Sequence, residues 1–249
     1  MSKRGPWDGM LAIVHFNWLF YAAALVVLGI GLAGVCLGGV FALGSGLAVL
    51  GCLWFLVGSL GVSHWIYDRS DLYRWAWLNR ALPRTSPENI LLCHSGFDEI
   101  SHLLKPMFPA AQWTLMDHFD PSVMTEASIR RARKRFPPTP GTVDARYDHW
   151  PVLDDTQTVV LGILAIHELR SIPERTAWFR EASRCLAADG RVVLVEHVRD
   201  AANFLAFGPG FLHFHSLASW RNSWEMAGFV LKDQFRITPF VRVFVLKAS

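Results

Sequence analysis

The sequence predicts an α/β fold: an open, doubly wound, mostly parallel seven-stranded sheet with a C-terminal antiparallel hairpin, preceded by a transmembrane helical hairpin. Three observations predict it. A long uncharged segment lies near the N-terminus. Five strand-like stretches then alternate with helical ones, and two more strand-like stretches around Thr238-Pro239 close the chain.

The composition of the 249-residue chain is that of a globular domain joined to a very apolar segment. Hydrophobic residues make up 52% of the chain and its mean hydropathy is +0.26, which is high for a soluble enzyme. The net charge of +3 is too small to indicate a nucleic-acid-binding protein. The four cysteines have no spacing typical of a zinc site or a disulfide framework, so we expect reduced, buried thiols.

The uncharged segment predicts two membrane-spanning helices. No Lys, Arg, Asp or Glu occurs from Trp18 to Trp65, about twice the ~20 residues that one span needs. We place the helices at about 17–37 and 43–65, with glycines at their interface and in the turn. A cleaved signal peptide would have a much shorter apolar core, of ~7–15 residues. A fully buried hairpin in a soluble protein is the other alternative.

Basic residues flank this segment, and none lies in its turn. The positive-inside rule therefore predicts that both termini are cytoplasmic, with the protein in the cytoplasmic membrane. The flanking basic residues are Lys3, Arg4, Arg69, Arg74, Arg80 and Arg84.

We expect three parts: a transmembrane hairpin at 1–66, a connecting helix at 67–87 and a globular domain at 88–249. The connecting segment mixes aromatic residues with arginines. This mixture is typical of a helix on the membrane surface, and it also fits a linker helix packed on the globular domain.

The strands of the globular domain are predicted from short apolar runs that end at turn residues. The stretch 156–166 is rich in β-branched and small residues, as a parallel strand covered on both faces should be. The expected strands are 89–93, 112–116, 142–144, 156–166, 191–196, 229–236 and 241–247.

Helical segments separate these strands. Pro137, Pro138 and Pro140 end the second helix, and Gly228 ends the last one. The basic run at 130–135 fits either a solvated helix face or a contact with anionic lipid headgroups. The expected helices are 98–107, 122–135, 173–186 and 219–227. We expect a turn at 187–190 and a loop rich in glycine and aromatic residues at 203–215.

Asp117 ends the second strand, about twenty residues after Gly96. In nucleotide-binding βαβ units, the turn after the first strand holds the cofactor against a helix N-terminus, and an acid at this distance bonds the ribose hydroxyls. Asp117 is therefore a candidate ribose ligand, with a helix-capping acid as the alternative.

Several segments resemble the class I S-adenosylmethionine-dependent methyltransferases. Residues 180–196 resemble the family's helix, turn and fifth strand, and 219–229 resemble its Ala-Gly-Phe turn with the preceding helix. The stretches 143–146, 150–153 and 159–169 resemble its third strand, acidic contact and fourth strand. The resemblance covers roughly 88–247, and it implies a Rossmann-like fold, S-adenosylmethionine as cofactor and methyl transfer.

The resemblance also implies the cofactor site. The first strand departs from the family's pattern, because Leu92 stands in the place of an acid and only Gly96 matches the three glycine places, with His94 and Asp98 in the others. Asp144 would contact the adenine, with a solvated loop acid as the alternative. The implied cofactor-binding residues are Cys93, His94, Ser95, Gly96, Asp117, His118, Asp144, Ala145 and Gly162.

The candidate catalytic residues lie at the expected edge of the sheet. His167 and Glu168 follow the fourth strand, and His197 follows the fifth. His213 and His215 lie in the 203–215 loop, which we expect to cover the methyl acceptor. A base is needed only if the acceptor is protonated. No third ligand has a convincing spacing to His213 and His215, so no metal is expected.

The leading hypothesis is a methyltransferase anchored in the membrane bilayer that acts on a lipid-like or apolar small molecule. The phenylalanines of the loop suit such an acceptor: Phe204, Phe207, Phe211 and Phe214. The alternative is a non-catalytic methyltransferase-like scaffold or binding module at the membrane. A third hypothesis, NAD in the same crevice, is disfavoured because the chain lacks a Gly-x-Gly-x-x-Gly turn.

Overall fold

The computed structural model describes residues 5–82 and 86–249. These residues form two compact units. The first unit contains the residues up to Tyr73 together with Asp200–Phe211, and the second contains Arg74–Arg199 and Leu212–Ser249. The three-part division expected from the sequence remains a prediction.

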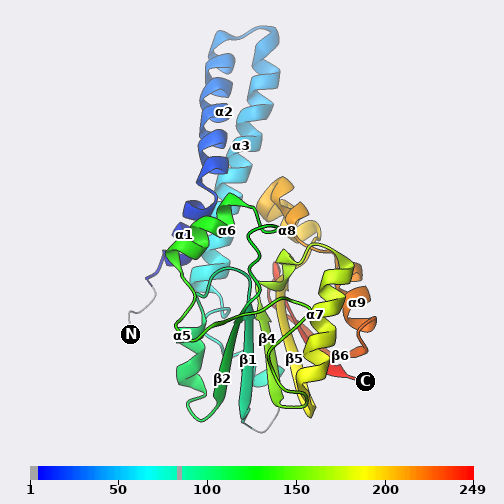
Figure 1. Cartoon of the computed structure of the whole chain (residues 1–249). Coiled ribbons are helices and arrows are strands. Elements are labelled where there is room, and N and C mark those ends of the chain that lie inside the picture. The colour runs from blue at the N-terminus through cyan, green and yellow to red at the C-terminus, as the bar shows by residue number, and fades with distance from the viewer. Residues whose placement is uncertain (1–4, 83–85) are drawn as a thin grey trace. The chain divides into compact units, whose positions relative to one another are not determined.

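The first unit is helical. It contains α1 (Asp8–Phe16), α2 (Trp18–Leu37), α3 (Val40–His64) and the π-helical turn η1 (Trp65–Arg69). Helices α2 and α3 lie side by side and antiparallel (Figure 1). The turn is shorter than expected, because Gly38 and Gly39, with φ of +71° and +62°, reverse the chain. Residues 43–46 therefore extend α3.

Helices α2 and α3 are long and apolar enough to cross a membrane, judged by length and composition. The two helices lie close together at two glycines. A Cβ at Gly31 would lie 2.9 Å from Val49 Cγ2, and one at Gly34 would collide with Ser45 Oγ. A Cβ at Gly29 would meet nothing within 4 Å. The predicted small-residue packing thus depends on Gly31 and Gly34.

The 203–215 segment is helical, so the predicted loop is wrong. It forms α8 (Ala201–Phe207) and the 3-10 helix η4 (Gly208–His213). Asp200 caps α8 by accepting a hydrogen bond from the Asn203 amide at 3.1 Å. Within the first unit, α8 packs on α3, where Trp54 Nε1 donates to Leu205 O at 3.0 Å.

The connecting segment, expected to be a short helix, is helical only in part over the residues that the structure describes. The helix ends at η1, and within the described residues 70–82 the next helix is the short α4 (Leu78–Ala81). The Ser70 side chain causes this ending. Its hydroxyl donates to Ile66 O at 2.6 Å and accepts from the Leu72 amide, which replaces the next helical turn.

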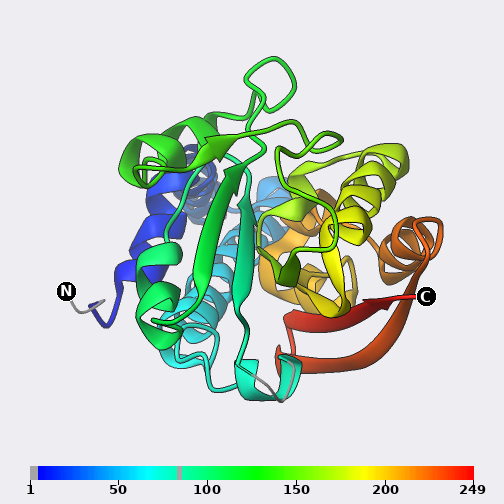
Figure 2. The ribbon, with the colours of Figure 1, turned by 60° about the horizontal axis from the view of Figure 1, so that its bottom comes forward.

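The second unit contains the sheet, with strand order β3-β2-β1-β4-β5-β7-β6. Strands β1 to β5 are parallel and β7 is antiparallel to both β5 and β6, which confirms the predicted fold class. Figure 2 shows the C-terminal hairpin at one edge of the sheet. The strands are β1 (Asn89–His94), β2 (Gln112–Asp117), β3 (Val143–Asp144), β4 (Gln157–Ile163), β5 (Leu186–His197), β6 (Phe229–Thr238) and β7 (Val241–Ala248).

Both faces of the sheet are buried, as the apolar strands predict. Leu91, Val160 and Leu194 belong to a core cluster that includes Trp178, Phe179, Trp220 and Trp224. Their neighbours in the strands, among them Leu92, Leu161 and Val193, are buried as well. The helices of the unit besides α4 are α5 (Ser101–Leu104), α6 (Ala127–Arg135), α7 (Ile172–Cys185) and α9 (Leu217–Glu225), with the 3-10 turns η2 (Lys105–Met107) and η3 (Ile166–Glu168).

Several boundaries differ from the prediction. Helix α5 begins only at Ser101, because the Asp98 carboxylate accepts hydrogen bonds from the Ile100 and Ser101 amides. Strand β4 ends at Ile163, since Leu164 adopts a φ of +51°. The turn expected at 187–190 is part of β5, whose pairing with β4 shifts register between Gln157 and Val159.

Candidate functional site

The ends of β1 and β2 meet at one edge of the sheet, where Asp117 is buried. Its Oδ1 accepts hydrogen bonds from the Gly96 amide at 2.8 Å and the Phe119 amide at 3.0 Å. Its Oδ2 forms an ion pair with Arg133 of α6. Burial alone would raise the pKa of Asp117, but His94 and Arg133 hold it well below its usual range. Asp117 is therefore a buried anion whose two oxygens both have partners.

Side chains of the segment that follows β2 pack against Gly96. A Cβ at Gly96 would lie 2.9 Å from Ile129 Cγ2 and 3.0 Å from Phe119 Cδ2. Arg133 Nη1 donates to Gly96 O at 2.9 Å, and its guanidinium lies 4.6 Å from the centre of the Phe119 ring. Side chains of this chain thus fill the space beside the glycine.

His94 and Ser95 present buried polar atoms beside this segment. The His94 ring nitrogens and Ser95 Oγ have no hydrogen-bond partner among residues 5–82 and 86–249. The nearest carboxylate oxygen, Asp117 Oδ1, lies 3.4 Å from His94 Nδ1, which is long for a hydrogen bond. Buried polar atoms are normally satisfied, so these atoms indicate a place for a ligand or water.

The other candidate cofactor residues have different surroundings. Cys93 lies in the core cluster, where burial raises the pKa of its thiol. Asp144 is exposed and pairs in register with Asp117. A Cβ at Gly162 would lie 2.6 Å from Ile166 Cγ1, so Gly162 allows close packing of the chain after β4.

His118 is buried and fully hydrogen-bonded. Its Nδ1 lies 2.8 Å from Ala145 O, its Nε2 accepts from Trp178 Nε1 at 3.1 Å, and its ring stacks on Trp150. Burial lowers the pKa of His118 to about 4. This geometry makes His118 a neutral core residue that joins β2 to Ala145 and α7.

These residues fit the expected S-adenosylmethionine only in part. Asp117 lies where a ribose-binding acid should be, and the unpartnered atoms of His94 and Ser95 fit the methionine end. Arg133 pairs with Asp117, and Phe119 and Ile129 lie beside Gly96. A ribose-binding role for Asp117 would require Arg133 to leave this carboxylate first.

A second cluster lies at the ends of β4 and β5, around the fully buried Glu196. Glu196 Oε1 accepts hydrogen bonds from the backbone amides of Ile166 at 2.9 Å and His167 at 3.2 Å. Its Oε2 lies 2.8 Å from His167 Nδ1. A carboxylate accepts hydrogen bonds only, so Nδ1 carries a proton and Nε2 points away from Glu196.

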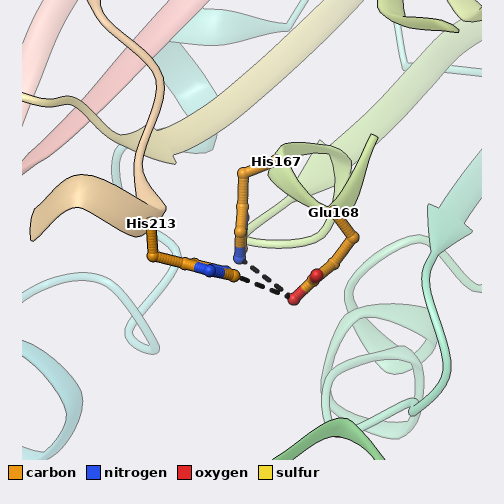
Figure 3. A group of neighbouring side chains, drawn as sticks. All are labelled: His167, Glu168 and His213. Atoms are coloured by element: carbon orange, nitrogen blue, oxygen red, sulfur yellow. Dashed lines mark ion pairs between the residues drawn. The ribbon is translucent and has the colours of Figure 1, made fainter. Parts of the chain in front are cut away.

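His167 Nε2 faces Glu168 and His213 (Figure 3). It lies 3.5 Å from Glu168 Oε1, and His213 Nε2 lies 3.6 Å from the same oxygen. Glu126 Oε1 lies 3.5 Å from His213 Nδ1. Burial alone would lower the pKa of His213, but Glu126 and Glu168 outweigh it and raise this pKa to about 9.

The remaining two candidate histidines lie outside this cluster. His197 Nδ1 lies 3.0 Å from Phe240 O, and its ring stacks on Phe214. His215 Nε2 lies 3.0 Å from His167 O and 3.1 Å from Leu169 O, next to the buried Arg175. Burial and Arg175 lower the pKa of His215 to about 3. Both imidazoles hold the backbone around the cluster.

Sequence reasoning missed Arg133, Glu126 and Glu196 as site residues. Glu196 had a recognisable signal, since it is a single acid that directly follows the apolar run 192–195 near the end of a strand. Arg133 had none, because it lies in a run of similar basic residues. Of the aromatic residues expected near the acceptor, Phe214 lies beside His167, with ring centres 6.4 Å apart.

Comparisons with known proteins give a clear result for structure only. No protein-family model and no curated protein sequence matches the chain. Among solved structures, a methyltransferase from Aquifex aeolicus described as S-adenosylmethionine-dependent matches with a TM-score of 0.52 and 14% identity, over 71% of this chain and 89% of that chain. The mitomycin 7-O-methyltransferase MmcR matches with a TM-score of 0.55 and 12% identity, over 99% and 74%.

The [4+2]-cyclase SpnF also matches, with a TM-score of 0.51 and 13% identity, over 73% of this chain and 82% of that chain. One fold thus carries more than one activity among these similar structures. The chain has the fold of the class I S-adenosylmethionine-dependent methyltransferases.

Proposed function

We propose that this protein is a membrane-anchored S-adenosylmethionine-dependent methyltransferase that acts on a lipid-like or apolar small molecule at the cytoplasmic face. The observation that carries the proposal is the His167–Glu196 pair, which holds an imidazole in one orientation at the carboxyl ends of β4 and β5. Ligands of open α/β sheets bind at this edge.

The side chains of the cluster have separate roles in this proposal. S-adenosylmethionine would supply an electrophilic methyl group on its sulfonium. Methyl transfer depends mainly on alignment of donor and acceptor. Glu196 fixes the His167 ring through Nδ1, so Nε2 remains as a proton acceptor for a protonated methyl acceptor. Glu168 Oε1 lies near both His167 Nε2 and His213 Nε2, so Glu168 and His213 would orient the acceptor.

The helices of the first unit support the proposal that the methyl acceptor is apolar. The segment between β5 and α9 includes α8, which packs on the apolar helix α3. Phe204 and Leu205 of α8 are exposed beside Trp54 of α3. An exposed apolar helix that packs on a candidate membrane helix suits a place at the bilayer interface. An acceptor that reaches the site from the bilayer would be lipid-like or apolar.

A non-catalytic methyltransferase-like module at the membrane is the second candidate. It is supported by the ion pair between Arg133 and Asp117 and by the side chains that fill the space beside Gly96. In such a module these contacts would be permanent, and the carboxyl ends of β1 and β2 would bind no nucleoside.

Titration of the full-length protein in detergent with S-adenosylmethionine distinguishes the two functions. We expect Arg133→Ala to strengthen binding on the order of tenfold, the equivalent of ~1.4 kcal/mol, because the cofactor no longer displaces the guanidinium. Lys134→Ala, which removes an exposed charge from the same helix, should leave the affinity unchanged. Asp117→Asn should weaken binding in either background.

Transfer of a labelled methyl group from the cofactor to a membrane lipid extract completes this test. Binding together with a labelled product supports the enzyme. An absence of binding in both the unchanged protein and Arg133→Ala would leave only the module.

A further inference from the structure

We propose that His167 Nε2, Glu168 Oε1 and His213 Nε2 form a binding site for a divalent first-row transition-metal ion of the zinc or iron(II) class. The three ligand atoms lie within 4.8 Å of one another (Figure 3). This proposal goes beyond methyl transfer, because metal binding by these side chains holds whether or not the chain binds S-adenosylmethionine.

The two separations that involve Glu168 Oε1 fit a shared ion better than direct hydrogen bonds. The two contacts with Glu168 Oε1 are 3.5 and 3.6 Å, longer than the 2.7–3.2 Å of ordinary hydrogen bonds. Two ligands of a tetrahedral ion with bonds of ~2.05 Å lie about 3.3 Å apart. Both contacts are thus within a few tenths of an ångström of the separation that an ion requires.

The groups that contact the second ring nitrogens of the two histidine ligands are arranged as in known metal sites. A ligating histidine usually donates its second ring N–H to a carboxylate or carbonyl, which fixes the ring and increases its basicity. His167 Nδ1 has this contact with the fully buried Glu196, and His213 Nδ1 faces Glu126. Arg170 Nη1 donates to His167 O at 2.9 Å and to His213 O at 2.7 Å, which ties the two ligand-bearing segments together.

The ligand set selects the class of metal. Two imidazole nitrogens and one carboxylate oxygen suit zinc or iron(II), whereas Mg²⁺ and Ca²⁺ prefer oxygen ligands alone. Three protein ligands leave a position open, as in catalytic zinc sites. An ion there would act as a Lewis acid on an acceptor oxygen and would take over the role proposed for His167 Nε2.

The competing interpretation is an ion-pair cluster in which a protonated His213 lies between Glu168 and Glu126. Such a cluster stabilises the fold but needs no metal. Only the metal site predicts that one metal ion binds per chain. This binding is measured without cofactor or methyl acceptor. Failure of methyl transfer would therefore leave the metal proposal intact, and the reverse also holds.

The test is a calorimetric titration of chelator-treated, full-length protein in detergent with Zn²⁺, together with the visible absorption of the Co²⁺ form. We expect one ion per chain, with intense absorption bands from four-coordinate Co²⁺. Glu168→Gln and His213→Gln should each weaken Zn²⁺ binding at least tenfold. His102→Gln, which removes an exposed imidazole on α5, should have no effect.

A further variant, Glu126→Gln, leaves all three proposed metal ligands in place. It should weaken binding roughly tenfold by removing the carboxylate that faces His213 Nδ1, at the low end of the 10–100-fold effects of such outer groups. The proposal is overturned if no ion binds with 1:1 stoichiometry, or if Glu168→Gln and His213→Gln bind Zn²⁺ as tightly as His102→Gln does.

Discussion

At the scale of single residues, two buried carboxylates at strand ends organise the candidate site. Asp117 ends β2 and accepts hydrogen bonds from two backbone amides, and Glu196 near the end of β5 does the same for the turn after β4. A buried charge is tolerated only when it is paired and hydrogen-bonded. Each acid therefore needs its cationic or imidazole partner, Arg133 or His167.

His213 should make the stability of the metal-free protein depend on pH. Its pKa is raised from 6.5 to about 9 in the folded state. The stabilisation is fully present below pH ~6.5 and is lost as the pH rises through 9, and it amounts to at most roughly 3 kcal/mol. The pKa values of His118 and His215 are lowered in the folded state, so these two residues reduce the stability of the fold only as the pH falls below ~6.5.

Melting curves of the chelator-treated protein in detergent at pH 6.5 and 9.5 measure this effect. We expect the melting temperature to fall between these values in the unchanged protein and to fall less in His213→Gln. Equal falls in both proteins would show that the ion pairs of His213 do not stabilise the fold.

At the scale of elements, side chains and close packing set the ends and pairings of the helices. Ser70 ends the segment that follows α3, and Asp98 delays the start of α5. The pairing of α2 with α3 depends on the absence of side chains at Gly31 and Gly34. Small residues at such positions allow the backbones of two membrane helices to approach closely.

Gly34→Leu should separate α2 from α3, because even its Cβ would collide with Ser45 Oγ. Gly29→Leu is the matched control on the same helix, since its Cβ would meet nothing within 4 Å. We expect Gly34→Leu to lower the melting temperature in detergent and to increase proteolysis of the 5–64 region, with little change in Gly29→Leu. Similar behaviour of the two variants would contradict the packing described for this pair.

At the scale of the whole molecule, one edge of the sheet collects the candidate groups. Strands β1 to β5 are parallel, so their carboxyl ends lie at the same edge, which carries both Asp117 and the His167–Glu196 pair. The sheet is buried on both faces, which leaves its edges and ends for ligands. The first unit supplies the apolar helices on which the proposed membrane location depends.

The proposed orientation predicts which thiols react from each side of a membrane. Cys36 is exposed and precedes the α2–α3 turn, whereas Cys93 and Cys185 are buried. We expect a membrane-impermeant maleimide to label Cys36 in right-side-out vesicles and not in inside-out vesicles. Leu153→Cys, at an exposed position of the second unit, should show the opposite pattern, with Cys36→Ser as the background control. The reverse labelling of both sites would refute cytoplasmic termini.

Much of the fold follows from local patterns in the sequence. The strands β1, β2, β6 and β7 lie within two residues of the predicted limits, because apolar runs and turn residues are local signals. The position of Asp117 follows from its spacing to Gly96 in a βαβ unit. The 203–215 segment was mispredicted, since its glycines and aromatic residues indicate a loop, whereas the packing of α8 on α3 favours a helix.

The sequence by itself determined the strands in their chain order, the apolar helical hairpin and most of the polar residues at the strand ends. Only the tertiary structure decided which of these residues meet. Arg133 pairs with Asp117, Glu196 holds His167, and Glu168 faces both His167 and His213. The physical reason is that periodicity reports which side of an element is buried, whereas the partner of a charged side chain depends on strands and helices brought together from distant parts of the chain.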